Sequence, residues 1–161
     1  MSVDPPPVTF TPIGRVRSPF GETSQIPKGP GAEHHAEGTI EIREDLADGL
    51  IDIEGFSHLF VLWVFDRRRE VTLVATPPND DRPHGVFATR APVRPNPIGL
   101  TVVELLRREG THLVVRGVDM LDGTPVLDIK PYLSGVPAEK VRRGWLEEAE
   151  RRQAASKPSW A

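Results

Sequence analysis

The sequence contains one stretch whose backbone has little conformational freedom, Gly85-Val-Phe-Ala-Thr-Arg-Ala-Pro-Val-Arg-Pro-Asn-Pro-Ile-Gly-Leu100. Its prolines at positions 92, 95 and 97 fix φ and bias each preceding residue toward extended geometry. The stretch is therefore predicted to be a rigid loop around which the rest of the chain forms a scaffold. Such a loop presents Arg90, Arg94 and Asn96 from a stiff backbone, which suits a fixed anionic or amide-rich ligand. The alternative is that the two arginines pair with acidic residues at the surface.

Composition limits the protein to a few classes. The chain has 161 residues, of which 38% are hydrophobic and 27% charged, as expected of one globular domain. It has no apolar run near the roughly 20 residues of a membrane span and no signal-peptide pattern, so a cytoplasmic location is expected. The absence of cysteine excludes disulfides and thiolate chemistry. The net charge of −3 gives no global attraction for nucleic acid, although local basic patches exist at 67–69 and 142–143.

Most of the regular structure is predicted to be β-strand. The run Phe56–Phe65 is nearly continuous in β-branched and aromatic residues, which predicts a core strand covered on both faces. The turn at 107–111 contains Gly110 and predicts an antiparallel hairpin between the segments on either side of it. The strands expected besides Phe56–Phe65 are Val8–Arg17, Gly38–Arg43, Val71–Ala75, Leu100–Leu106, His112–Val118 and Val126–Lys130.

A different pattern follows the last strand. Pro137 precedes a segment with Val141, Trp145 and Ala149 at helical spacing, which predicts an amphipathic helix from Pro137 to Gln153. Because this strong helical pattern follows several short strands, the fold is expected to be mainly β, a single-sheeted β-barrel with a C-terminal α-helix. The expected organisation is an arm at 1–10, a barrel domain at 11–133, and the helix and tail at 134–161.

Other polar residues gather near the end of the last strand. Asp128, Lys130 and Tyr132 alternate along it and share one face. They form either a structural ion pair on a solvated surface or, if they lie beside the Arg90 loop, a set that handles protons. The run Asp122-Gly-Thr-Pro125 predicts a tight turn, which also exposes backbone polar groups.

The histidines give weaker signals. His58 lies within the predicted core strand and is expected to be a buried group with its hydrogen bonds satisfied. His34 and His35 are adjacent and match no zinc-ligand spacing, so no metal site is expected. No Gly-x-Ser-x-Gly motif supports a serine hydrolase.

Four of these stretches together resemble the TsaA-like domain, the family of tRNA N6-threonylcarbamoyladenosine methyltransferases. They are 85–100, Asp122-Gly-Thr-Pro-Val-Leu-Asp-Ile-Lys-Pro-Tyr132, Gly55-Phe-Ser-His-Leu59 and Ile13-Gly-Arg-Val-Arg-Ser-Pro-Phe20. The resemblance runs from about Thr11 to Leu133. It implies a barrel, usually dimeric, that binds S-adenosylmethionine and methylates N6 of a modified adenosine in the tRNA anticodon loop.

The resemblance also implies roles for individual positions. The cofactor-binding residues it implies are Pro27, Lys28, Gly29, Asp66, Arg67, Arg90, Leu100, Asp122, Gly123, Thr124 and Pro125. Because the acceptor nitrogen belongs to a urea-like group and is a poor nucleophile, a base or stabilising donors are expected. The catalytic candidates are Asn96, Asp128, Lys130 and Tyr132, and Arg94 is assigned to substrate binding.

This chain departs from the family pattern in three ways. Gly29 replaces a common glutamine, Asp66 replaces a common histidine, and the second C-terminal domain of longer members does not follow the helix. The contacts that bind tRNA would then come from elsewhere, such as a dimer partner. Two rival functions therefore stay open: a methyltransferase acting on a small molecule, and a non-catalytic regulatory domain that binds S-adenosylmethionine.

Overall fold

The structure is a computed structural model that describes residues 4–28, 32–67 and 70–157. Gly29 and two arginines of the basic run at 67–69 lie outside these ranges. The strands are β1 (Gly14–Arg17), β2 (Glu37–Ile42), β3 (His58–Val64), β4 (Val74–Ala75), β5 (His84–Gly85), β6 (Ile98–Glu109), β7 (His112–Arg116) and β8 (Pro125–Pro131). The α-helix is α1 (Trp145–Ser156), and short 3-10 turns occupy Thr23–Gln25, Glu44–Leu50, Ile53–Gly55, Val86–Ala88 and Ala138–Lys140.

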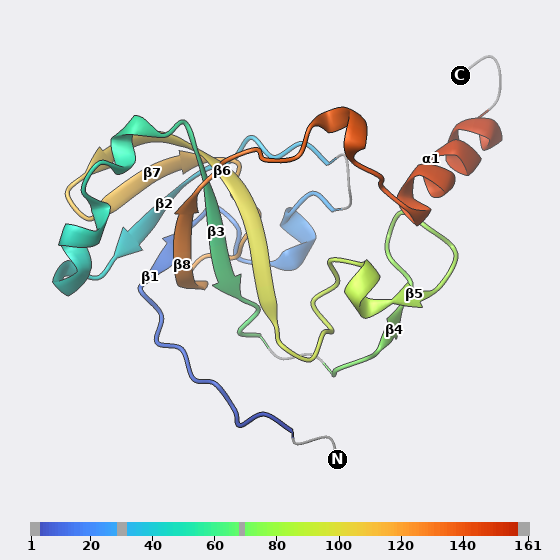
Figure 1. Ribbon diagram of the computed structural model, residues 1–161, viewed down its shortest axis with the longest axis horizontal. Coiled ribbons are helices and arrows are strands. Elements are labelled where there is room, and N and C mark those ends of the chain that lie inside the picture. Colours follow the sequence, from blue (N-terminus) through green and yellow to red (C-terminus); the bar gives the residue numbers. More distant parts are fainter. Residues whose placement is uncertain (1–3, 29–31, 68–69, 158–161) are drawn as a thin grey trace.

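Six strands pair in the order β1-β2-β7-β6-β3-β8, and β8 pairs again with β1, so the sheet closes into a barrel (Figure 1). Every pairing is antiparallel, and the predicted hairpin is the β6–β7 pair. The mainly β class with one C-terminal helix is thus confirmed. Strand β4 lies within the predicted strand Val71–Ala75. Its partner β5, and the small second sheet that the two form apart from the barrel, were not predicted.

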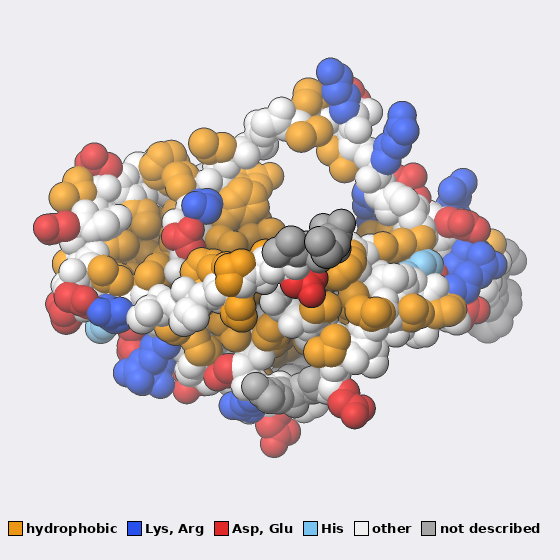
Figure 2. Space-filling view, turned by 60° about the horizontal axis from the view of Figure 1, so that its bottom comes forward, with side chains coloured by type: hydrophobic (Ala, Val, Ile, Leu, Met, Phe, Trp, Pro, Cys, Tyr) orange, Lys and Arg blue, Asp and Glu red, His pale blue; other side chains and the backbone are white. Residues whose placement is uncertain are grey.

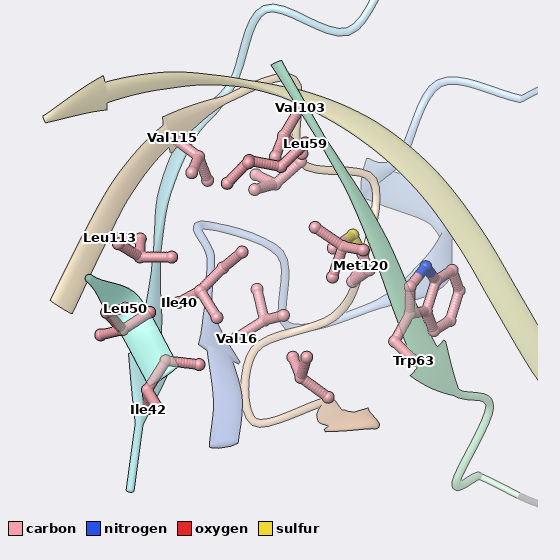
Figure 3. Packing of buried hydrophobic residues seen from close by; sticks show 13 residues of the cluster. Val16, Ile40, Ile42, Leu50, Leu59, Trp63, Val103, Leu113, Val115 and Met120 are labelled. Carbon is pink, nitrogen blue, oxygen red and sulfur yellow. The ribbon is translucent and has the colours of Figure 1, made fainter. Parts of the chain in front are cut away.

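The barrel interior is filled by alternate residues of the strands (Figure 3). In β3, Leu59, Val61 and Trp63 are buried, whereas the residues between them are partly exposed. The prediction that this strand is covered on both faces is therefore wrong, because only the inward face packs. His58 is exposed at the start of the strand, so the expectation of a buried histidine is also wrong. The buried cluster comprises Val16, Ile40, Ile42, Leu50, Leu59, Val61, Trp63, Val103, Leu113, Val115, Val118, Met120 and Val126.

The predicted C-terminal helix begins eight residues late. Gly144 has φ +55°, a conformation that interrupts a right-handed helix and that glycine tolerates, and α1 starts at the next residue. Val141, placed on the helix by its spacing, lies outside α1 and is exposed. Trp145 and Ala149 remain on the helix.

Helix α1 packs on the β4–β5 segment, away from the barrel (Figure 1). Trp145 stacks on His84 with ring centroids 4.2 Å apart, and its Nε1 donates to the Ala88 carbonyl at 2.8 Å. Asp80, whose side chain is 3% exposed, accepts from His84 Nε2 at 2.8 Å and from Arg152 Nη2 at 2.6 Å. These hydrogen bonds hold the pKa of Asp80 below its ordinary value. A buried but fully partnered carboxylate therefore joins the helix to the loop before β5.

The N-terminal strand is shorter than predicted. β1 begins at Gly14, and Val8 and Phe10 are exposed on a segment that runs away from the barrel (Figure 1). Pro12 supplies no N–H for strand pairing. Within β1, Gly14 is required by packing, because a Cβ there would stand 2.1 Å from the Glu41 carbonyl oxygen.

The segment joining β8 to α1 arches over an opening beside the barrel (Figure 2). Its residues from 131 to 144 are all exposed, and among them are Leu133, Val136 and Val141. Within the described ranges, no helix has the length and apolar character needed to cross a membrane.

Candidate functional site

A cavity of about 390 Å³ lies at one end of the barrel. Four chain segments meet there: the 3-10 turn after β1, the end of β3 with the residues after it, the proline-rich loop before β6, and the β7–β8 connection. The described residues around it are Thr23, Ile26, Trp63, Val64, Phe65, Asp66, Arg67, Val71, Pro92, Arg94, Pro95, Pro97, Asp119, Met120, Leu121 and Thr124. The size is that of a small-molecule site.

The proline-rich loop lies between the 3-10 turn Val86–Ala88 and β6, and hydrogen bonds fix its position. Phe65 N donates to the Pro97 carbonyl at 2.8 Å, and Thr72 N donates to the Val93 carbonyl at 2.8 Å. Arg94 Nη1 donates to the carbonyls of Thr89 and Ala91 at 3.0 and 3.3 Å. This arginine therefore braces its own loop while its side chain borders the cavity.

Asp119 is a cavity residue that sequence reasoning missed. Its Oδ1 accepts a hydrogen bond from Thr101 Oγ1 at 2.5 Å, and Thr101 Oγ1 in turn accepts from Trp63 Nε1 at 3.0 Å. Burial raises the pKa of the Asp119 carboxyl, and the nearby charges of His34 and Arg90 offset this only in part. The only sign of Asp119 in the sequence was its position as an acidic residue between two hydrophobic ones, Val118 and Met120. The structure shows that both of these neighbours are buried.

The Trp63 side chain reaches Thr101 because β6 has no side chain at Gly99. Trp63 pairs with Gly99 across the β3–β6 ladder. A Cβ at Gly99 would lie 2.2 Å from the indole ring, closer than any packing allows. The glycine of the proline-rich motif therefore leaves room for the ring that orients the Asp119 network.

Several sequence-predicted residues do meet at this cavity. Asp66, Arg67 and Thr124 line it, as does Arg94. Arg67 Nη1 also donates to the Gly21 carbonyl at 3.1 Å, which ties two of the four segments together. Arg90 is exposed and outside the lining, yet its charge acts on Asp119, so it lies near this end. Pro27 and Lys28 are exposed and follow the lining residue Ile26.

The Asp122–Pro125 turn adopts the predicted tight geometry beside the cavity. Gly123 has φ +83°, and Asp122 Oδ1 accepts a hydrogen bond from Ser18 N at 3.1 Å. Asp122 thus fastens the turn to the segment after β1. Pro125 begins β8 and pairs with Arg15.

The remaining candidates lie outside this cavity. Leu100, Asp128 and Lys130 are on the outer face of the barrel, where Lys130 Nζ and Asp128 Oδ2 form an exposed ion pair of 3.0 Å. Tyr132 packs on Phe60, with ring centroids 5.1 Å apart. Asn96 is exposed, and its carbonyl accepts from Ile98 N at 2.7 Å.

The histidines do not gather. His58 Nδ1 lies 2.9 Å from the Ser57 hydroxyl at the surface, and His35 faces Glu33. His34 Nδ1 is buried without a hydrogen-bond partner in the described structure. No group of three or more metal-ligating side chains was found among the described residues.

Comparisons with known proteins agree with one another on the proteins that this chain resembles. Residues 15–137 match the family model described as the tRNA-methyltransferase O N-terminal domain. An S-adenosyl-L-methionine-binding protein of Archaeoglobus fulgidus is 46% identical over 121 residues, 75% of this chain and 86% of that protein. The tRNA (adenine(37)-N6)-methyltransferase of Escherichia coli is 40% identical over 134 residues, 77% of this chain and 57% of the enzyme.

A solved structure gives the same result for the fold. The crystal structure of TrmO from Pseudomonas aeruginosa superposes with a TM-score of 0.71 at 36% identity, covering 89% of this chain and 63% of that one. The chain thus spans less than two thirds of both the E. coli enzyme and the P. aeruginosa structure. With more than half of its residues matched by the family model, this chain belongs to the family of the tRNA-methyltransferase O N-terminal domain.

Proposed function

We propose that this protein is an S-adenosylmethionine-dependent methyltransferase that methylates N6 of threonylcarbamoyladenosine in the tRNA anticodon loop. The observation that carries the proposal is the meeting of Asp66, Arg67 and Thr124 at one cavity. These residues come from two segments, 66–67 and 122–125, to which the family resemblance assigns cofactor contacts. The names of the relatives, one binding S-adenosyl-L-methionine and another methylating tRNA adenine, support the same assignment.

The residues present fit the cofactor. Its amino-acid part is a zwitterion, and the cavity has both an acid, Asp66, and a base, Arg67, at its rim. Arg67 suits the carboxylate because a guanidinium binds it through two parallel hydrogen bonds. The turn at 122–125 offers backbone groups for an adenine edge. We propose that Pro27, Lys28, Gly29, Arg90 and Pro125 complete the cofactor contacts. Leu100, which the resemblance also implies, lies on the outer face of β6 and is not among them.

When bound, the cofactor supplies an activated methyl group on a positively charged sulfur. The chain's own contribution is then chiefly alignment of donor and acceptor. Arg94 is proposed to hold the substrate, since its guanidinium borders the cavity from a braced loop. Asn96, Asp128, Lys130 and Tyr132 are proposed to act on the acceptor nitrogen.

The decisive experiment is methyl transfer to bulk tRNA. The protein would be incubated with labelled S-adenosylmethionine and tRNA from cells lacking the native enzyme, and the nucleosides analysed by mass spectrometry. We expect label in threonylcarbamoyladenosine. Label in a small-molecule extract instead would favour the metabolite enzyme, and cofactor binding without any transfer would favour the regulatory domain.

The catalytic candidates have their own test. Asp128→Asn is expected to lower kcat by about 100-fold, the contribution typical of general acid–base groups, with cofactor affinity unchanged. A kcat equal to that of the wild type would remove Asp128 from the chemistry. A second outer-face carboxylate, Glu104, pairs with Arg116 and serves as the matched control through Glu104→Gln.

We further propose that the protein is a cytoplasmic homodimer in which 11–133 is the barrel domain, 1–10 an arm and 134–161 a helix and tail. The outer face of β6 exposes Ile98, Leu100 and Val102, each at 40% or more, and apolar side chains gather beside the opening in Figure 2. A second copy covering this face would bury them. Sedimentation should give twice the monomer mass, and Leu100→Glu should give the monomer. A monomeric wild type would contradict this.

A further inference from the structure

Asp119 has an orientation that its neighbours fix. Thr101 has one hydroxyl hydrogen, and because the Trp63 indole N–H donates to the same oxygen, that hydrogen is directed to Asp119 Oδ1. Trp63 itself is held by packing against Gly99. The carboxylate is therefore presented to the cavity by a relay that leads back to a buried aromatic ring.

This carboxylate lacks an ion-pair partner. Within the described structure, no arginine, lysine or histidine lies within salt-bridge distance of Asp119. His34 and Arg90 act on it only through the longer-range effect of their charges, and burial still raises its pKa. Burying a charged carboxylate without a partner is unfavourable. A cation in the cavity would remove this cost.

The wall around Asp119 selects the kind of cation. Trp63 and Phe65 lie against each other with ring centroids 4.3 Å apart, and Met120 and Leu121 are beside them. An ammonium group keeps strong hydrogen bonds to water and suits the exposed Asp66 at the rim. A sulfonium has no N–H to donate and is weakly hydrated, so an aromatic wall with one carboxylate can hold it by charge and cation–π attraction.

We propose that Asp119 is the counter-ion of the cofactor's sulfonium and that it makes the site prefer the methyl donor over the demethylated product. The inference rests on the proposed function. In the transfer, the C–S bond would break with sulfur keeping the electron pair, while the acceptor nitrogen would bond the methyl group and lose its proton to water or to the base proposed above. The product sulfur is neutral. Asp119 is then again without a cation, which weakens product binding and favours release.

The test compares two ligands that differ in this charge. Calorimetry at neutral pH would measure S-adenosylmethionine and S-adenosylhomocysteine binding to the wild type, to Asp119→Asn and to Asp45→Asn, a control carboxylate paired with Arg43 elsewhere on the surface. Asp119→Asn is expected to weaken the donor by about tenfold or more, the worth of a charged contact. The product should change by less than about threefold on the same scale, and the control should change neither.

The outcomes separate this inference from the function it rests on. If the wild type binds neither ligand, the proposed function fails before any variant is made. If the wild type binds both and Asp119→Asn weakens both equally, Asp119 contacts a part that the two ligands share, and the inference is overturned. Unchanged donor affinity overturns it as well.

A pH titration of the wild type covers the case in which Asp119→Asn does not fold. Protonation of Asp119 should reduce the donor-to-product affinity ratio as pH falls toward the ordinary carboxyl value of 3.8, because the Asp119 pKa lies above it. His34 and Arg90 act on Asp119 through their charges, and Asp66, Arg67 and Arg94 line the same cavity. Contacts to the shared amino-acid part cancel in the ratio, and the variants His34→Gln and Asp66→Asn remove in turn the contributions of these two groups. A ratio constant down to pH 3.8 overturns the inference.

Discussion

The cavity end of the barrel and the outer face of β8, β3 and β6 both carry residues that the sequence marks as functional, but they are built differently. At the cavity end, four segments are held together by backbone and side-chain hydrogen bonds, and a carboxylate is half-buried. On the outer face, residues stand in rows: Asp128 lies opposite Leu62, which lies opposite Leu100. These side chains are exposed or partly exposed.

The difference separates two kinds of recognition. A preformed cavity with opposite charges and an aromatic wall suits a small ligand whose shape and charge are fixed. An open sheet face with apolar rows and exposed ion pairs gains from covering by a macromolecule or a second copy. We therefore assign the cofactor to the cavity end and the larger partners to the outer face.

The strongest way to break the cavity end is Gly99→Ala. The added Cβ would stand 2.2 Å from the Trp63 ring, so strand or ring must shift. We expect a loss of about 3 kcal/mol in the free energy of unfolding, the upper range for overpacking, together with loss of cofactor binding. Urea denaturation and calorimetry measure these two effects.

Two control substitutions test whether the effect of Gly99→Ala is specific to the cavity end. Gly49→Ala adds a methyl group with no atom within 4 Å and should change neither quantity. Leu100→Ala, next to Gly99 but on the outer face, should leave the Trp63 position unchanged. If Gly99→Ala were as stable as the wild type, the tight contact would not govern the cavity.

Arg90→Ala tests whether the cavity end extends to the exposed part of the proline-rich loop. A charged hydrogen bond to the cofactor is worth about 1.5–3 kcal/mol, so its loss should weaken binding by well over tenfold. Calorimetry gives the dissociation constant directly. An unchanged constant would remove Arg90 from the site and confine the cofactor contacts to the lining residues.

Much of the fold was readable from sequence because strand periodicity and turn residues are local signals. The hairpin around Gly110 and the turn at Gly123 both follow from them. The start of α1 was misplaced because Gly144 was read as one more position in a helical pattern, although its positive φ interrupts the helix. Strand β4 was predicted within Val71–Ala75, but the two-residue β5 is too short for periodicity to reveal, so the β4–β5 sheet was missed.

Only part of the candidate site could be predicted from the sequence, for a related reason. Asp66, Arg67 and Thr124 were found through resemblance, which is a property of stretches. Asp119 acquires its character from Thr101 and Trp63, which are distant in sequence and meet only when the barrel closes. The burial and the pKa of a side chain depend on such tertiary contacts, so no local sequence pattern predicts them.

Asp80 sharpens the comparison because its carboxylate, unlike that of the partly buried Asp119, has two basic hydrogen-bond partners. Its pKa is lowered, so its contribution to α1 docking is present above its ordinary value of 3.8 and is lost only as pH falls below it. We expect amide hydrogen exchange in α1 to show the same protection at pH 7 and about pH 5, after correction for intrinsic rates. Asp80→Asn should reduce that protection at neutral pH, and Glu148→Gln, exposed beside the same arginine, should not. Equal protection in Asp80→Asn would show that packing of Trp145 alone holds the helix.

The smallest effect on stability and cofactor affinity is expected for Lys130→Ala on the outer face. The ion pair with Asp128 spans 3.0 Å, but both side chains are about half exposed or more, and such pairs contribute from nothing to about 1 kcal/mol. The variant should unfold at nearly the wild-type urea concentration and bind the cofactor with an affinity within about twofold of wild type, since Lys130 borders no part of the cavity. A large loss of cofactor affinity would show that the outer face takes part in the cofactor site, and the division between the two regions would not hold.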